Sequence, residues 1–294
     1  MIGEVVSSLR NQGGTRVRAA LVGDERMATA DLATHDDPGL FGPGSVAWRV
    51  HAESSMLIGG LRALLLQTLH PLALAGVADH SVYRQDPWGR LHRTARFIGA
   101  TTYGNTATAE QIIARIRAIH AQVTGVAPDG TPYEANDPHL LLWVHITEID
   151  SFLRAYDRYA PGRLTDDERD RYVAEMAGIG RRLGAENVPT SWVELAECLE
   201  SFRSECEPGP QARESVRFLL MPPVPFLLRG PYGLIGAASV GLLPAWARHQ
   251  LRLPLPPGLD PLAIRPATAL LTRSIGWLLN EETVNRHDDK LLTA

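Results

Sequence analysis

The stretch that decides the fold is residues 70–94, HPLALAGVADHSVYRQDPWGRLHRT. Pro71 interrupts a helix arriving from the N-terminal side, and Asp86-Pro87 places a capping carboxylate before a proline at the first position of the next helix. That next helix carries arginines, a histidine and a threonine at helical spacing, in a chain whose residues are 45% hydrophobic. The segment therefore predicts helices with a polar stripe beside the wall of a cavity.

Helix signals continue along the whole chain, whereas alternating β-branched runs joined by Asn-Gly turns are missing. Capping residues predict four further helix starts, at Asp137-Pro138, Thr108 with Gln111, Thr165 with Glu168, and Ser191 with Glu194. Helix ends are predicted at Gly104, Gly125, Pro161-Gly162 and Gly184. The sequence thus predicts an all-α fold, organised as a single multi-helix domain over residues 1–294.

Upstream of Pro71, a long helix is predicted from Ser45 to His70. Its buried face follows from the spacing of its apolar side chains, Ile58, Leu61, Leu65 and Leu69.

Composition narrows the classes of function. The formal net charge of −4 provides no general attraction to nucleic acid, so nucleic-acid binding is not expected. Two cysteines, Cys198 and Cys206, lie eight residues apart on a predicted helix and cannot build a disulfide scaffold. The N-terminus shows no export signal. These features predict a cytoplasmic protein.

Residues 230–247 form an uncharged stretch between Arg229 and Arg248 whose length approaches a membrane span. Pro231 and Pro244 break the stretch, so a buried core helix is the favoured interpretation. A membrane-surface or hydrophobic-substrate role is the second interpretation and a transmembrane helix the third.

Several kinds of catalytic site lack the residues they require. The sequence has no Glu-x-x-His pair, no His-Glu-x-x-His zinc helix, no Gly-x-Ser-x-Gly nucleophile turn and no Cys-x-x-Cys-His motif for covalent haem. Gly178 and Gly180, with Gly184, do not have dinucleotide-binding spacing and are interpreted as residues of helix packing or termination.

A predicted helix from Glu110 to Gly125 places His120 on the same face as Ile113 and Ile116, directed toward the core. A neutral imidazole on an apolar face suits axial ligation of haem iron. The alternative is a core histidine with satisfied hydrogen bonds.

In the preceding helix, Arg90, Arg93, Thr94 and Phe97 form one stripe at offsets of three, four and seven. Arginine stripes commonly face solvent. The functional interpretation is that one guanidinium meets a haem propionate, while another guanidinium and the threonine hydroxyl stabilise negative charge that develops on dioxygen.

Taken in order, several segments resemble the MpaB and rubber-oxygenase (latex-clearing) catalytic-domain family over roughly residues 45–250. The similar segments are His70–Ser81, Asp86–Leu91, Arg117–Gly125, Tyr133–Pro138 and Leu142–His145. The resemblance implies an all-α fold with a globin-like core and non-covalent haem b. It also implies dioxygen-dependent chemistry, which in relatives includes oxidative cleavage of isoprenoid double bonds. Residues 1–44 and 251–294 then become peripheral helices.

The resemblance also implies roles for individual residues. His120 matches the proximal iron ligand. Arg90, Arg93 and Thr94 match the distal group. The expected cofactor-binding residues are His120, Arg117, Arg90 and Phe97. The Arg-x-x-Lys-Thr pattern of rubber oxygenases here carries arginine at position 93, which is a poor iron ligand. A five-coordinate or water-bound resting iron is therefore expected. His145, on an apolar helical face, is the second candidate for the ligand.

The leading hypothesis is a haem b-dependent oxygenase that acts with dioxygen on a hydrophobic small molecule, such as an isoprenoid or lipid, with an electron donor where one is needed. One alternative is a haem-binding sensor or carrier without turnover. A third is a cofactor-free, membrane-associated helical protein that binds lipid.

Overall fold

The computed structural model describes residues 27–81, 86–256 and 258–291. Over this part of the chain helices dominate, which confirms the all-α prediction. The α-helices are α2 (Val46–His51), α3 (Met56–Gln67), α4 (Pro71–His80), α5 (Pro87–Tyr103), α6 (Thr106–His120), α7 (Pro138–Tyr159), α8 (Asp166–Leu183), α9 (Trp192–Ser201), α10 (Pro210–Leu220), α11 (Arg229–Leu242), α12 (Ala245–Gln250) and α13 (Arg265–Leu291). Shorter helical turns are η1 (Thr29–Asp31), η2 (Phe202–Glu205), η3 (Phe226–Leu228) and η4 (Asp260–Ile264). The globin-like core and the single-domain organisation stay predictions, and residues 1–26 of the predicted N-terminal periphery lie outside the described residues.

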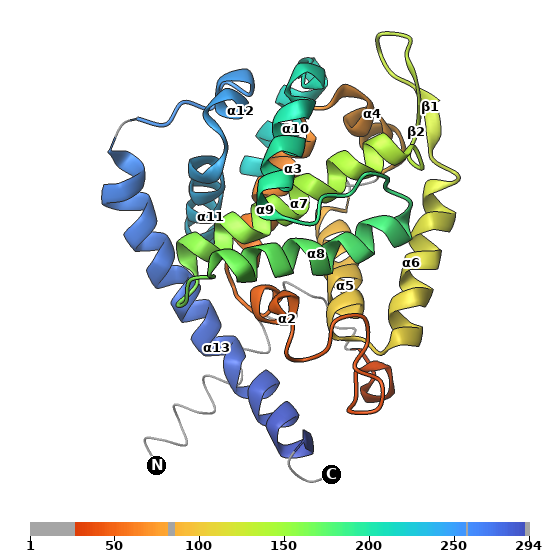
Figure 1. Cartoon of the computed structure of the whole chain (residues 1–294). Helices are drawn as coiled ribbons and strands as arrows, with labels where there is room; N and C mark the ends of the chain where they lie inside the picture. The colour runs from red at the N-terminus through yellow and green to blue at the C-terminus, as the bar shows by residue number, and fades with distance from the viewer. Residues whose placement is uncertain (1–26, 82–85, 257, 292–294) are drawn as a thin grey trace.

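Helices α7 and α8 run side by side through the middle of the molecule, with α5 and α6 at one end and α13 along the opposite side (Figure 1). Helix α7 is the central helix of this arrangement, because most of its 22 residues are buried. It packs against α3, α8, α9 and α11.

Helices α3 and α7 approach closely because Gly59 has no side chain. A Cβ atom at this position would lie 2.8 Å from Phe152 Cδ1 and 3.1 Å from the Ser151 carbonyl oxygen. The predicted apolar face of the upstream helix is confirmed, since Ile58, Leu61, Leu65 and Leu69 are all buried.

A buried ion pair crosses the same interface. The Arg62 Nη2 atom lies 2.7 Å from Asp150 Oδ2, and both side chains are fully buried. Arg62 also donates to the Ser151 hydroxyl (2.6 Å) and to the Leu242 carbonyl at the end of α11 (2.9 Å). One guanidinium therefore ties together three helices that are distant in sequence.

Most of the predicted helix boundaries are confirmed. Asp86 accepts a hydrogen bond from Gly89 N–H, Asp137 from His139 N–H, and Thr165 and Glu168 form the complete capping box. The helix ends at Gly104, Pro161-Gly162 and Gly184 are also found, and Gly184 has the left-handed φ of 110°. At Ser191 the cap is present, but the Glu194 carboxylate accepts from Thr190 N–H instead of closing the box.

The long helix predicted from Ser45 to His70 is wrong, because the structure contains two helices, α2 and α3, in its place. Ser45 caps α2, and residues 52–55 form a turn before α3 begins. The Ser54 hydroxyl in this turn donates to the Thr272 carbonyl of α13 at 2.8 Å. Polar side chains that bond to backbone favour turns over helix interiors, and this tertiary contact favours the break.

The boundaries predicted for the His120 helix are also wrong. Asn105, not Thr108, is the N-cap, and the helix ends at His120 rather than at Gly125. Gly125 instead lies in β1 (Thr124–Val126), which pairs antiparallel with β2 (Pro132–Glu134), so this part of the described chain contains a short hairpin that the sequence did not predict. A Cβ atom at Gly125 would lie 2.5 Å from the Tyr133 hydroxyl, so the glycine serves close packing.

The uncharged stretch of residues 230–247 is divided between α11 and α12. Within the described residues no single helix is long and apolar enough to span a membrane. The pair Met56–Gln67 and Pro71–His80, bent by 106°, meets the criterion only when its two helices are taken together, by length and composition.

The buried Arg62–Asp150 pair provides a test of the α3–α7 interface. Asp150→Ala leaves the Arg62 charge buried without its carboxylate, so the free energy of unfolding should fall by about 3–5 kcal/mol in urea denaturation. Arg154→Ala is the matched control, since Arg154 also pairs with Asp150 but is 40% exposed, and a loss under about 1 kcal/mol is expected. Equal losses in the two variants would contradict this account of the interface.

Candidate functional site

A pocket lies between α5, α6, α7 and α8, with α2 at one end. It contains about 60 Å³ of free space. Its polar wall consists of three histidines, one carboxyl group and one hydroxyl, from His51, His120, His145, Glu148 and Thr101. The remaining wall is apolar and includes Phe97, Ile98, Leu141, Val144, Phe152, Met176, Ile179 and Leu183.

The three histidines differ in their hydrogen bonding. His51 is satisfied on both nitrogens, because Nδ1 lies 2.8 Å from the Thr102 hydroxyl and Nε2 lies 3.0 Å from the Tyr172 hydroxyl. His120 Nδ1 and His145 Nε2 are buried and have no hydrogen-bond partner among the described residues. An unpaired buried donor or acceptor is costly. These two rings are therefore the pocket groups whose chemistry suits a ligand.

The surroundings of these rings keep them neutral. Burial lowers the pKa of His145 to about 4, with a smaller contribution from the positive charge of Arg181. Burial also lowers the pKa of His120, and the positive charge of Arg90 lowers it further. A neutral imidazole is the form that binds a metal.

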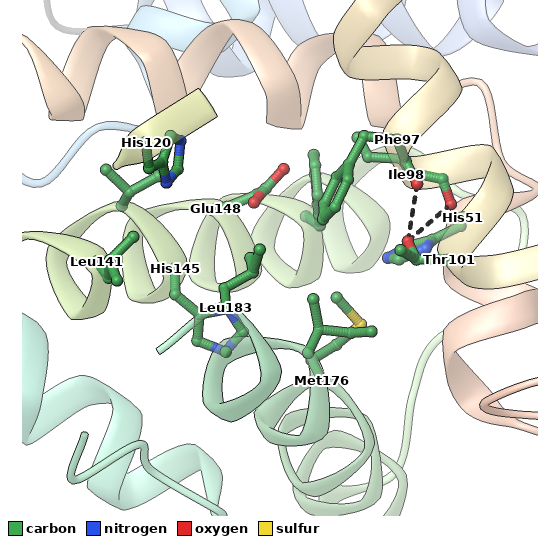
Figure 2. A pocket seen from close by; sticks show the side chains of 14 residues that line it. His51, Phe97, Ile98, Thr101, His120, Leu141, His145, Glu148, Met176 and Leu183 are labelled. Atoms are coloured by element: carbon green, nitrogen blue, oxygen red, sulfur yellow. Dashed lines mark hydrogen bonds between the residues drawn. The ribbon is translucent and has the colours of Figure 1, made fainter. Parts of the chain in front are cut away.

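The two free rings differ in the space around them. His145 lies against α8, where a Cβ atom at Gly180 would come within 3.0 Å of its unpaired Nε2. Figure 2 shows the His145 ring directed toward α8, whereas His120 and the Glu148 carboxyl lie farther from α8 in the same pocket. Gly180 thus has the packing role predicted for it, and His120 is the less confined ring.

Glu148 is a pocket residue that the sequence reasoning missed. It is partly buried one helical turn after His145, and burial raises its pKa to about 7. The signal available in the sequence was its position three residues after His145, on the same face of an apolar helix. A carboxyl group with this pKa can hold or release a proton near neutral pH.

The structure brings only part of the predicted site together. Phe97 lines the pocket, and Arg90 is near enough to His120 to lower its pKa. Arg93 is exposed and lies 3.5 Å from Asp86, and Thr94 is exposed with its hydroxyl donating to the Arg90 carbonyl. Arg117 is exposed and donates to the Arg182 carbonyl of α8 at 3.4 Å. These last three side chains are not among the residues that line the pocket.

The donor set constrains the kind of cofactor. No three histidine and carboxyl donor atoms of the described pocket residues lie within 4.8 Å of one another, so the pocket does not present a preformed site for a bare metal ion. Single, unpaired and neutral imidazoles could hold a metal that brings its other ligands with it, as haem iron does. The donors thus fit haem iron, although the free space is smaller than a porphyrin.

Glu148 predicts a pH dependence of stability. Its pKa is about 7 in the folded chain and near 4.5 when exposed, so the folded state retains a proton that the unfolded chain loses as the pH rises between these values. Glu148→Gln should therefore be more stable than the parent by up to about 3 kcal/mol above pH 7, and equally stable below pH 4.5. Urea denaturation across this range measures the difference, with the exposed Glu134→Gln as control. A gain independent of pH would contradict the burial of this carboxyl.

Comparison with known proteins supports the enzyme class. Residues 48–274 match the family model described as ER-bound oxygenase mpaB/B′/rubber oxygenase, catalytic domain. No curated protein and no solved structure matched the chain. The matched region includes all the helices that wall the pocket apart from the first residues of α2. The chain belongs to the mpaB and rubber-oxygenase catalytic-domain family.

Proposed function

We propose that the protein is a haem b-dependent oxygenase that acts with dioxygen on a hydrophobic small molecule of the isoprenoid or lipid class. Membership of an oxygenase family supports the reaction class. The observation that carries the cofactor assignment is the buried His120 nitrogen, which has no partner among the described residues and belongs to a ring lining the pocket. When bound, haem supplies the redox chemistry that activates dioxygen.

In this proposal His120 holds the iron and His145 is the second candidate. His120 is ranked before His145 because the backbone of α8 at Gly180 lies against the His145 ring and leaves little room for a ligand there. Phe97 provides apolar wall, and the apolar side chains of α7 and α8 exclude water and suit a hydrocarbon substrate.

Arg90, Arg93 and Thr94 form the proposed distal group and Arg117 a further contact to the cofactor. Among these residues, Arg90 gives the strongest support for the assignment. Its positive charge lowers the pKa of His120, and its guanidinium donates a hydrogen bond to the Ser81 hydroxyl at 2.9 Å. Thr94 is tied to the same turn of α5 through the Arg90 carbonyl. A fixed guanidinium stabilises negative charge without giving up a proton.

Glu148 enters the proposal as the group that moves a proton. Its carboxyl lines the same pocket, and its raised pKa of about 7 makes both protonation states accessible at neutral pH. No other carboxyl group was found among the described pocket-lining residues.

The cofactor assignment is tested by absorption spectra of purified protein in the oxidised and reduced forms. The parent should show a haem Soret band, and His120→Ala should weaken or shift that band strongly because the residue proposed to hold the iron is lost. His51→Ala is the matched control, since His51 lines the same pocket with both nitrogens already bonded.

The spectra of the His51→Ala control and of a His145→Ala variant distinguish the possible ligands of the iron. A band lost in His145→Ala but kept in His120→Ala assigns the iron to His145. A purified parent without a Soret band, even after addition of haemin, contradicts haem binding and favours the cofactor-free alternative.

Turnover of a substrate distinguishes the oxygenase hypothesis from the hypothesis of a haem-binding sensor or carrier. An oxygenase consumes dioxygen in proportion to the product it forms from a hydrophobic substrate, whereas a haem-binding sensor or carrier binds the gas without net consumption. Oxygen uptake with isoprenoid and lipid substrates measures this difference, and any requirement for an electron donor shows in the same assay.

We also propose a peripheral membrane contact through η3 and the residues around it, with the protein otherwise cytoplasmic. Phe226 is 79% and Leu227 85% exposed, Met221 and Leu228 are exposed nearby, and Arg229 follows directly. Contiguous exposed apolar side chains mark interaction surfaces, and a cation beside them suits anionic headgroups.

Vesicle flotation tests this contact. Replacing Phe226 and Leu227 together by serine should reduce binding to anionic phospholipid vesicles at least about tenfold, because two apolar side chains no longer enter the interface. Leu270→Ser is the control, since Leu270 is 69% exposed on α13. Equal loss in the control, or no binding by the parent, would argue against this surface.

A further inference from the structure

A second group of potential metal ligands lies outside the pocket. His70 precedes α4, His139 is the second residue of α7, and Glu205 ends η2. Their donor atoms all lie within 4.8 Å of one another, and this was the only group of three or more such donors found in the described part of the chain. Glu205 Oε2 lies 2.8 Å from His139 Nε2 and 3.4 Å from His70 Nε2.

His70 shows that this cluster is incomplete as a network of hydrogen bonds. Its side chain is only 4% exposed, and neither ring nitrogen makes a hydrogen bond with any described residue. A buried imidazole beside a carboxylate and a second imidazole provides the kinds of donor that a metal ion requires.

We propose that His70, His139 and Glu205 bind a divalent transition-metal ion of the zinc type. Two histidines and one glutamate form a recurrent zinc ligand set, in which a fourth position stays open to water or another ligand. Bonds of about 2.1 Å at tetrahedral angles put ligand atoms roughly 3.4 Å apart, close to the separation between His70 and Glu205. His139 and Glu205 are 52% and 40% exposed, so an ion can enter from solvent.

The surroundings support the site. His139 stacks on Phe202 with ring centroids 4.4 Å apart, and the His70 ring lies 6.1 Å from that of Trp143. These aromatic rings limit the orientations of both imidazoles and lower the local dielectric, which strengthens metal binding. Asp137 adds negative charge near His70.

This site is separate from the pocket. His139 precedes His145 by six residues on α7, which is about 9 Å along the helix axis and a different face. His70, His139 and Glu205 are not among the pocket-lining residues. A metal here would join the starts of α4 and α7 to the end of η2, three segments distant in sequence.

Zinc titration tests the assignment. The full chain without a histidine tag, stripped of metal by a chelator, is titrated with zinc chloride in a calorimeter. The parent should bind one equivalent with a Kd in the micromolar range or tighter, and its Tm should rise on zinc addition. His139→Ala and Glu205→Gln should each weaken binding on the order of 100-fold and abolish the rise in Tm. His70 stays unchanged because removing a buried ring also affects folding.

Two control variants locate the ion. His35→Ala removes an exposed histidine outside the cluster, and His120→Ala removes one of the two pocket rings with an unpaired nitrogen. Both should keep the stoichiometry and affinity of the parent, and circular dichroism should show every variant folded. Absence of saturable binding by the parent, unchanged affinity in His139→Ala and Glu205→Gln, or loss in His120→Ala would each overturn the proposal. None of these outcomes bears on the haem spectrum.

Discussion

The buried ion pair between Arg62 and Asp150 is the interaction on which the rest of the molecule depends. Charges are stable in a dry interior only when paired and hydrogen-bonded. Here the Asp150 carboxylate of α7 pairs with the Arg62 guanidinium, which also donates hydrogen bonds to a hydroxyl of α7 and a carbonyl of α11. The pair therefore specifies how α3, α7 and α11 meet. The absence of a side chain at Gly59 lets the two main helices come close enough for the pair to form.

The position of α7 then determines both candidate sites. His139, at its start, faces the metal-ligand cluster, and His145 and Glu148, further along, line the pocket. One helix held by a buried charge thus supplies residues to two separate sites. Such rigid placement suits functional groups, because ligands and reacting groups need fixed geometry.

Burial also sets the chemistry of the pocket. The same loss of solvation that lowers the pKa values of His120 and His145 raises that of Glu148, so all three groups favour their neutral forms. A neutral pocket with apolar walls is consistent with the hydrophobic substrate proposed above, and Arg90 provides a positive charge near His120. This combination accords with the oxygenase family to which the chain belongs.

Local signals in the sequence determined the all-α class and most helix boundaries, because caps such as Asp86, Asp137 and Thr165 act within one turn of their own helix. They also indicated that His120 faces inward. The break in the predicted Ser45–His70 helix has a partner far along the chain, the Thr272 carbonyl. After the His120 helix the chain enters a hairpin in which Gly125 packs against Tyr133.

Only the tertiary structure revealed the Arg62–Asp150 pair, the carboxyl of Glu148 in the pocket and the meeting of His70, His139 and Glu205. Helical periodicity shows which face of a helix is apolar, but it carries no information on which other helix covers that face. The physical reason is that burial, pairing and pKa depend on neighbours brought together from distant parts of the chain, and these exist only once the helices have packed.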